Sequence, residues 1–239
     1  MCSFTLGADP ELLCRLNGKY VPAHQYFKSA SSFGLDGCEA IAEIRPGFSE
    51  SPVDVTSKIY QILEYGHTKA PDLEFYSGHF VDNMSLGGHL HFSIKPESNI
   101  VDALDTVLYS LSNCIDDREQ RTKREKCGYG KRKATRLQPH GFEYRTPGSW
   151  LLSPTVTLVT FTLAKLAVLG VTEDNLDFTD IKGRQHSSTF LRNLKNNLLT
   201  IPSDCNEGLK QLDILLSNKE INWNQNILPN WGIVSAEAA

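Results

Sequence analysis

Four pairs of chemically active side chains in this chain are each separated by a single residue. The pairs are Asp9 with Glu11, Glu43 with Arg45, His89 with His91, and Glu143 with Arg145. Because successive side chains of a β-strand point to opposite faces, this spacing places both members of a pair on one face. Four such strands in one sheet would form a polar face of carboxylates, imidazoles and guanidiniums. Divalent cations and phosphates bind such groups, so these pairs are the main indication of function.

The carboxylates of these pairs, with one imidazole, form a candidate metal site. Magnesium prefers oxygen ligands, and nucleotide-binding sites commonly hold it with a few carboxylates while substrate phosphates complete the shell. The predicted ligands are Asp9, Glu11, Glu43, Glu143 and His89. The nitrogen of His89 would also suit manganese. Any one of these carboxylates alone would be read as a solvated surface charge, and the His89/His91 pair alone as a half-exposed strand.

A basic segment over residues 118–136 precedes the Glu143/Arg145 strand. It contains Lys131, Arg132, Lys133 and Arg136, and Gly128-Tyr129-Gly130 forms a hinge before them. Guanidinium groups bind phosphate in bidentate fashion, so a glycine-flanked basic loop can close over a polyphosphate. Two other interpretations remain open: a solvated charge run and a nucleic-acid patch. With magnesium-type carboxylates opposite, nucleotide phosphate is the simplest target.

Composition places the chain among ordinary globular proteins. It has 239 residues, 40% apolar and 22% charged, with a net charge of -4 and a pI near 6.0. The negative charge argues against a nucleic-acid partner. Six cysteines without a CxxC pair, and no signal peptide, predict reduced thiols and a cytoplasmic location. The longest apolar run, over residues 158–169, is interrupted by polar side chains, so no membrane partner is expected.

The elements that must position these groups are strands alternating with a few helices. Strands are predicted over 3–16 with a break at Pro10, and over 19–21, 42–46, 73–80, 86–94 and 141–146. Helices are predicted over 51–65, 99–115, 153–170, 188–199 and 207–216. Residues 29–37, rich in Ser and Gly, are predicted as a loop. The pattern indicates an α+β fold with helices packed on one face of a mainly antiparallel sheet.

Four ordered segments of the chain resemble one known family. They are Gly7-Ala8-Asp9-Pro10-Glu11-Leu12, Ala42-Glu43-Ile44-Arg45-Pro46 preceded by Asp36-Gly37, Gly88-His89-Leu90-His91-Phe92-Ser93, and Gly141-Phe142-Glu143-Tyr144-Arg145-Thr146-Pro147. Together they resemble the phage-type carboxylate-amine ligases, also called amidoligases of type 2, which are similar to the glutamine synthetase and glutamate-cysteine ligase superfamily. The resemblance covers roughly residues 7–154, and the C-terminal third contributes little to it.

The resemblance implies a curved antiparallel sheet, with helices on its outer face, whose concave face binds ATP with two or more magnesium ions. A substrate carboxylate would be phosphorylated, and an amine would then displace phosphate from the acyl phosphate to form an amide. By motif position, Glu11, Glu43 and Glu143 would be metal ligands. Asp9 and His89 would complete the shell of a second metal.

The same resemblance assigns the remaining polar residues to the nucleotide and its phosphates. His91 would lie near the nucleotide, and Arg145 with the cluster of Lys131, Arg132 and Arg136 would neutralise its phosphates. The expected catalytic residues are Arg145, Lys131, Arg132 and Arg45. The expected substrates are a small-molecule or peptide carboxylate and an amine; the identity of the amine and the oligomeric state are left open.

The expected organisation is an ATP- and metal-binding catalytic core over 1–170 and a C-terminal helical extension over 171–239. Two other functions remain as alternatives at this stage. One is a metal-dependent oxygenase or hydrolase built on His89, His91 and a carboxylate. The other is a nucleic-acid-binding module that uses the basic segment.

Overall fold

Two antiparallel sheets and a group of helices form the part of the chain that the computed structural model describes, residues 3–37, 39–182, 186–218 and 221–234. The first sheet has the strand order β1-β9-β11-β10; the second has the order β3-β2-β5-β4, and β6 also pairs with β2. A separate hairpin pairs β7 with β8. The strands are β1 (Leu6–Ala8), β2 (Glu11–Leu16), β3 (Lys19–Val21), β4 (Phe33–Leu35), β5 (Ala42–Ile44), β6 (Leu73–Tyr76), β7 (Phe80–Val81), β8 (Met84–Ser85), β9 (Leu90–Phe92), β10 (Thr135–Gln138) and β11 (Gly141–Tyr144).

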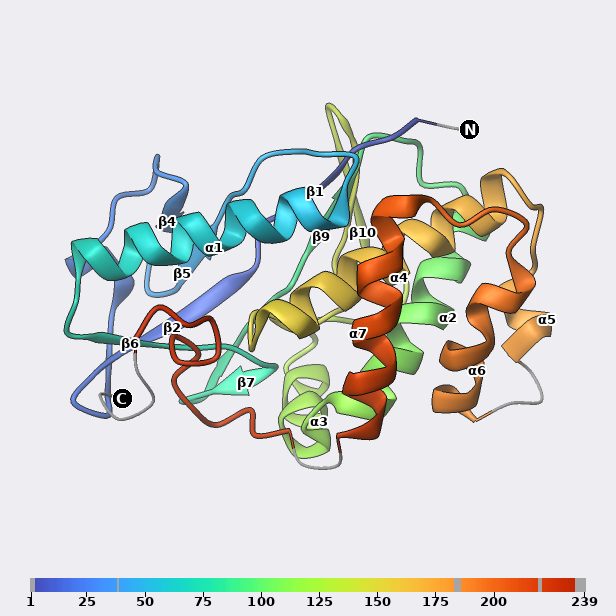
Figure 1. The fold of residues 1–239 in the computed structure, drawn as a ribbon. Helices are drawn as coiled ribbons and strands as arrows, with labels where there is room; N and C mark the ends of the chain where they lie inside the picture. The colour runs from blue at the N-terminus through green and yellow to red at the C-terminus, as the bar shows by residue number, and fades with distance from the viewer. Residues whose placement is uncertain (1–2, 38, 183–185, 219–220, 235–239) are drawn as a thin grey trace.

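The helices gather mainly at one end of the molecule, while the second sheet lies at the other end (Figure 1). They are α1 (Pro52–Lys69), α2 (Ser98–Ile115), α3 (Arg118–Lys126), α4 (Pro154–Thr172), α5 (Phe178–Lys182), α6 (Ser187–Asn193) and α7 (Asn206–Ser217). The two helix starts predicted from the Ser-Pro sequences, those of α1 and α4, are confirmed. Ser51 Oγ accepts from the backbone N–H of Asp54 at 3.4 Å, and Ser153 Oγ from that of Val156 at 3.2 Å.

The four spaced pairs do not lie in one sheet, so that expectation is wrong. Pro10 has no backbone N–H, and the strand breaks there into β1, which belongs to the first sheet, and β2, which belongs to the second. The break nevertheless joins the two sheets. On one side, the N–H of Asp9 and that of Glu11 donate to the carbonyls of His89 and Gly87; on the other, Ile44 N–H donates to Pro10 O. The pairs therefore border one common region.

Several elements differ from the sequence prediction: β10 and α5 were not predicted, and two further differences have a clear physical cause. Residues 33–35, expected within a loop, form β4, because Phe33 and Leu35 are buried against the core and the strand pairs with β5. The first half of the basic segment forms α3, which has no apolar stripe to signal it. The carboxylate of Asp117 caps α3 by accepting from the N–H groups of Glu119 and Gln120 at 2.8 and 3.0 Å.

The C-terminal helices share one hydrophobic core with the rest of the chain. Leu212 and Leu215 of α7 and Phe190 of α6 belong to the same buried cluster as Phe92 of β9. Helix α7 packs on α4, and α6 packs on α2. The division into a catalytic core and an extension at residue 170 stays a prediction.

Helix α4 is long and apolar enough to cross a membrane by length and composition alone. However, 83% of its most apolar window is buried inside the fold. It is covered by α1, α2 and α7. This burial is typical of the central helix of a packed core. Length and composition alone are weak evidence for a membrane span.

Four cysteines lie in the described part of the chain, and all four carry free thiols: Cys14, Cys114, Cys127 and Cys205. Cys14 and Cys205 are buried, and burial raises the pKa of each thiol to about 12. A buried thiol with a raised pKa is a poor nucleophile. Cys2 and Cys38 lie outside the described residues.

Candidate active site

The registers of the first sheet line up one row of positions on a single face. Gly7 lies opposite His91, His91 opposite Glu143, and Glu143 opposite Arg136. Residues directly opposite each other in antiparallel strands project to the same side of the sheet. His91, Glu143 and Arg136 therefore form a polar row across β9, β11 and β10, and Gly7 adds no side chain at the end of that row.

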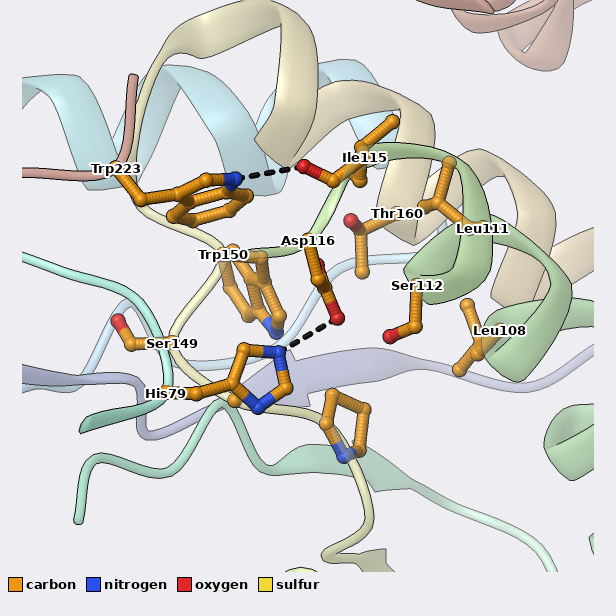
Figure 2. Close-up of a pocket in the computed structure, with 12 residues that line it drawn as sticks. His79, Leu108, Leu111, Ser112, Ile115, Asp116, Ser149, Trp150, Thr160 and Trp223 are labelled. Atoms are coloured by element: carbon orange, nitrogen blue, oxygen red, sulfur yellow. Dashed lines mark hydrogen bonds and ion pairs between the residues drawn. The ribbon is translucent and has the colours of Figure 1, made fainter. Parts of the chain in front are cut away.

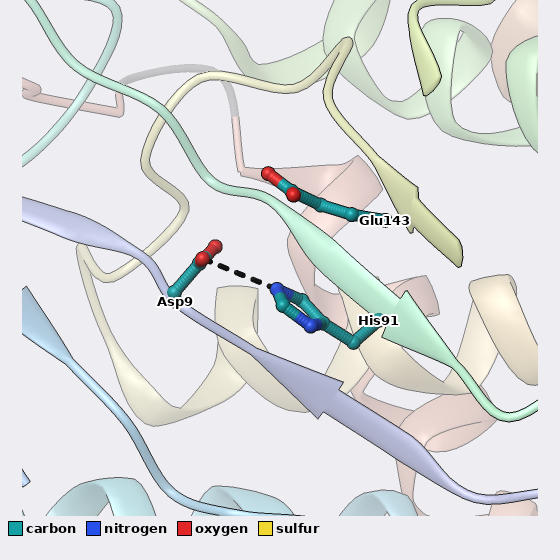
Figure 3. Close-up of side chains that lie close together, drawn as sticks. All are labelled: Asp9, His91 and Glu143. Carbon is teal, nitrogen blue, oxygen red and sulfur yellow. Dashed lines mark ion pairs between the residues drawn. The ribbon is translucent and has the colours of Figure 1, made fainter. Parts of the chain in front are cut away.

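Three side chains converge closely enough to hold a metal ion. One ligand atom from each of Asp9, His91 and Glu143 lies within 4.8 Å of the others (Figure 3). Asp9 Oδ2 is 3.2 Å from His91 Nε2. Asp9 Oδ1 and His91 Nε2 are buried, and their 3.2 Å contacts with His89 Nδ1 and Asp9 Oδ2 are poorly directed, so both atoms could instead bind a cation. This set of two carboxylates and an imidazole fits magnesium or manganese.

His89 approaches the same carboxylates from a second direction. Its Nδ1 lies 3.2 Å from Asp9 Oδ1 and 3.1 Å from Glu143 Oε1. Burial disfavours the charged form of Asp9, but hydrogen bonds and charge from His89 and His91 outweigh it and hold the pKa of Asp9 well below its usual range. Asp9 is therefore an anion at neutral pH, as a carboxyl group must be in order to bind a metal ion.

Tyr129 connects His89 to Glu11. Its hydroxyl lies 3.0 Å from His89 Nε2 and donates to Glu11 Oε1 at 3.0 Å. The other oxygen of Glu11 accepts from the N–H of Gly87 at 2.7 Å. Burial raises the pKa of Glu11, and burial together with Glu11 raises that of Tyr129. Tyr129 thus remains a neutral hydroxyl that can hold both groups in place.

The guanidinium of Arg124 packs against one face of the Tyr129 ring. It lies 4.7 Å from the ring centroid and donates to the carbonyls of Thr146 and Pro147 at 2.7 and 2.8 Å. Burial lowers the pKa of Arg124 to about 10, so it stays charged at neutral pH. A side chain at Gly130 would collide with this guanidinium. The hinge glycine noted in the sequence therefore makes room for Arg124.

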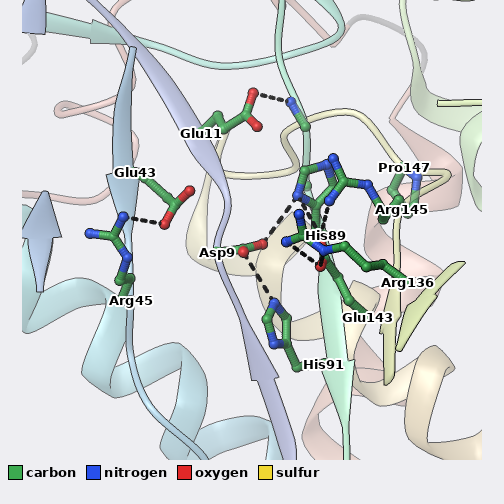
Figure 4. A network of polar contacts seen from close by, with 12 residues as sticks. Asp9, Glu11, Glu43, Arg45, His89, His91, Arg136, Glu143, Arg145 and Pro147 are labelled. Atoms are coloured by element: carbon green, nitrogen blue, oxygen red, sulfur yellow. Dashed lines mark hydrogen bonds and ion pairs between the residues drawn. The ribbon is translucent and has the colours of Figure 1, made fainter. Parts of the chain in front are cut away.

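Glu43 brings a further carboxylate to the site from the second sheet. It lies opposite Glu11 in the pairing of β5 with β2 (Figure 4). Burial and the negative charge of Asp9 raise the pKa of Glu43 to about 8, although Arg45 lies 2.6 Å away and opposes the shift. Without a bound cation, Glu43 is therefore largely protonated at neutral pH. A divalent cation beside it would favour the charged carboxylate.

Two arginines border the buried carboxylate of Glu143. Arg145 Nη1 lies 2.6 Å from Oε1, while Arg136 Nε donates to Oε2 at 2.7 Å. Gln138 adds a hydrogen bond to Oε2 at 3.0 Å. Glu143 itself is fully buried. Arg136 and Arg145 thus hold two positive charges beside the candidate metal ligands.

Two of the other predicted cations, Arg45 and Arg132, are turned toward protein groups. Arg45 donates to the carbonyl of Leu35 at 2.7 Å and to two further loop carbonyls. Arg132 Nε donates to the buried carboxylate of Asp105 at 2.7 Å. The Lys131 side chain is exposed, and its backbone carbonyl accepts from Thr146 Oγ1. The catalytic roles expected of Arg45, Arg132 and Lys131 stay predictions, and for the two arginines these contacts favour holding loops.

One family model matches almost the entire chain. It is the model described as phage phiEco32-like COOH.NH2 ligase-type 2, and it matches residues 6–230. The chain belongs to this family. The match continues well past residue 154, so the C-terminal third is part of the family's sequence pattern, contrary to the expectation that it contributes little. No curated protein sequence matches the chain.

Family membership supports a carboxylate-amine ligase over the two alternative functions, and the charges of the basic segment agree. In this family member Lys133 pairs with Asp102 at 2.6 Å and Lys123 with Glu119 at 2.7 Å. Together with the ion pairs of Arg132 and Arg136, these contacts neutralise much of residues 118–136. These four side chains remain more than half exposed, so it is their carboxylate partners, rather than burial, that reduce the free positive charge of the segment.

Several side chains of the ligase site were not predicted from the sequence. Tyr129 was noted only as part of a hinge, and Gln138, His140 and Phe48 were not singled out. His140 lies in the turn between β10 and β11 and stacks on His91, with ring centroids 5.2 Å apart. Burial and the neighbouring His91 lower the pKa of His140. Phe48, Tyr129 and His140 lie in turns and loops, where no periodic pattern could indicate them, and Gln138 is the last residue of β10, a strand that was not predicted.

A second polar group lies outside the ligase site (Figure 2). His79 Nε2 is 2.6 Å from Asp116 Oδ2, and both side chains are buried beside Trp150 and Trp223. The adjacent cavity of about 20 Å³ has room for one water molecule. Ser149 Oγ, which lines it, has no partner in the protein. These features indicate a buried polar contact beside a cavity of the size of one water molecule, and none of the predicted site residues lies there.

Proposed function

We propose that this protein is an ATP- and Mg²⁺-dependent carboxylate-amine ligase that forms an amide or peptide bond through an acyl phosphate. The observation that carries the proposal is the convergence of Asp9, His91 and Glu143, with Arg145 held against Glu143. Family membership supports the reaction class. The proposal includes a curved, glutamine synthetase-like arrangement of the two sheets around this site.

The donor groups suggest which residues would hold metal. Asp9 and Glu143, with His89 or His91, would hold one ion; Glu11 and Glu43 would hold another. Bound divalent metal would screen the negative charge of the nucleotide phosphates. Arg145 and Arg136 would add positive charge on the side of Glu143, where charge develops during phosphoryl transfer.

The proposed reaction has two steps. A carboxylate oxygen of the first substrate attacks the γ-phosphorus of ATP, and ADP leaves. The nitrogen of the amine then attacks the acyl carbon, inorganic phosphate leaves with the bonding electron pair, and the amine loses a proton to solvent. The expected substrates remain a small-molecule or peptide carboxylate and an amine.

An isotope experiment tests the acyl phosphate. The protein is incubated with ATP, Mg²⁺, amines and a pool of carboxylates labelled with ¹⁸O, and the released phosphate is analysed by mass spectrometry. An acyl phosphate requires one labelled oxygen to pass from the carboxylate to the phosphate. Unlabelled phosphate, with amide formed, would show that a different activated intermediate is used.

Glu143→Gln tests the assignment of the metal site. We expect this variant to lose amide formation by at least about 100-fold, because it removes an anionic ligand and leaves two arginines without their carboxylate. Glu119→Gln, at an exposed position on α3 outside the site, is the matched control. Circular dichroism would establish that both variants are folded at the assay temperature. Wild-type turnover in folded Glu143→Gln would refute its role as a ligand.

A further inference from the structure

The ring of Phe48 fills the position that Gly7 leaves open at the end of the polar row. A Cβ atom at Gly7 would lie 2.8 Å from the Phe48 ring, so the ring rests directly on the backbone of β1. Gly7 is opposite His91 in the sheet. Phe48 therefore lies on the same face as His91, Glu143 and Arg136.

Phe48 belongs to a small group of aromatic rings next to the candidate metal ligands Asp9, His91 and Glu143. Its ring centroid is 4.8 Å from that of His140 and 6.4 Å from that of His91. His91 and His140 are stacked, with 18° between their planes. His91 is thus shared by the aromatic group and by the candidate metal ligands Asp9 and Glu143.

Phe48 is also unusually open to solvent for so large an apolar side chain. The residue is 46% exposed, although it lies beside a site made of charged and polar groups. An aromatic ring with a free surface can stack on a planar ring of a ligand, and such stacking contributes favourably for every nucleobase.

We infer that Phe48, together with His140, forms a stacking subsite for the planar base of a nucleoside triphosphate. The phosphates of the same ligand would lie along Asp9, Glu143 and Arg145, with His91 between the two parts. This inference rests on the proposed function, because it requires that a polyphosphate binds at the metal ligands. It adds a base-binding residue that none of the four sequence motifs contains.

Two probes separate the base from the phosphates. Calorimetry would measure binding of Mg²⁺ with the non-hydrolysable ATP analogue AMP-PNP and of Mg²⁺ with inorganic tripolyphosphate, which has no base. Phe48→Ala is expected to weaken AMP-PNP binding about five- to hundredfold, the range for loss of one stacked base, and to leave tripolyphosphate binding unchanged. Phe48→Trp should retain the affinity for AMP-PNP.

Two further variants control for indirect effects. Gly7→Ala should displace the Phe48 ring and reproduce the selective loss, because the added methyl group needs the space that the ring occupies. Tyr65→Ala removes an equally exposed ring from α1 and should change neither affinity.

The possible outcomes separate this inference from the proposed function. Unchanged AMP-PNP affinity in Phe48→Ala, or an equal loss for both probes, would overturn the stacking subsite. If the wild-type protein binds neither probe in the presence of Mg²⁺, the proposed function fails, and the inference fails with it.

Discussion

At the scale of single residues, hydrogen bonds from neutral groups orient the candidate metal ligands. His89 faces Asp9 and Glu143 with Nδ1 and faces Tyr129 with Nε2. The same tyrosine hydroxyl donates to Glu11. A histidine that binds metal through one nitrogen generally needs a partner for the other, since that partner sets the tautomer and the ring orientation. Tyr129 is in the right place to be that partner.

Tyr129→Phe tests this positioning role. The variant keeps the ring that packs on Arg124 but loses the hydroxyl, so we expect Mn²⁺ affinity to fall about tenfold or more with little change in melting temperature. The measurement is a titration of Mn²⁺ followed by electron paramagnetic resonance of the free ion. Tyr60→Phe on α1 is the matched control and should bind as the wild type does. Unchanged affinity in Tyr129→Phe would show that its hydroxyl does not position the ligands.

At the scale of elements, a buried carboxylate on α2 anchors the basic loop. Asp105 is fully buried and accepts from Arg132 Nε, from the backbone N–H of Lys133 and from the hydroxyl of Tyr144. The contacts tie the loop after α3 both to a helix of the core and to β11. Because a buried charge is costly without partners, the loop and the helix stabilise each other.

Asp105→Ala should therefore destabilise the protein and loosen the loop. Removing one partner of a buried, hydrogen-bonded pair is expected to lower the free energy of unfolding by about 3 kcal/mol. Denaturant titration would measure this change, and trypsin should cleave faster near Lys131 and Arg132. Asp102→Ala breaks only the exposed pair with Lys133, so its effect should stay below about 1 kcal/mol. Equal effects of the two variants would contradict the proposed anchor.

At the scale of the whole molecule, one hydrophobic core joins the sheets to the C-terminal helices. Helix α4 lies at its centre, packed against α1, α2 and α7. The family match through residue 230 covers these helices as well as the site. Because the buried faces of α6 and α7 are part of that core, we expect residues 171–234 to unfold together with the site rather than as a separate unit.

Two aliphatic residues of α7, one buried and one exposed, test this cooperativity. Leu212 is 2% exposed, whereas Ile214 on the same helix is 61% exposed. Leu212→Ala should lower the free energy of unfolding by about 2–5 kcal/mol through the cavity it creates, and Ile214→Ala by much less. Tryptophan fluorescence and circular dichroism should report a single, coincident transition in both variants. Two separate transitions would instead establish a boundary between a catalytic core and an extension.

Much of the local structure was predictable because it depends on neighbours in sequence. The Ser-Pro starts at Ser51 and Ser153 and the apolar periodicity of α1 and α2 identified the main helices. Two of the missed elements lack such signals: α3 is polar on all sides, and β4 is a three-residue strand in a Ser- and Gly-rich segment. Both depend on contacts that only the folded chain provides.

The spacing of two in the four pairs predicted, from strand geometry, that the members of each pair project toward one region. One member of each pair, namely Asp9, Arg45, His89 or Arg145, lies just beyond the end of a strand. The spacing could not determine that Pro10 divides the first strand between two sheets, nor which strands lie next to each other. Only the tertiary structure decided that Arg136 and Arg145 meet Glu143, that Arg132 turns to Asp105, and that Tyr129 reaches Glu11. The physical reason is that backbone geometry controls direction within a strand, whereas the partner of each charged side chain is set by long-range pairing and burial.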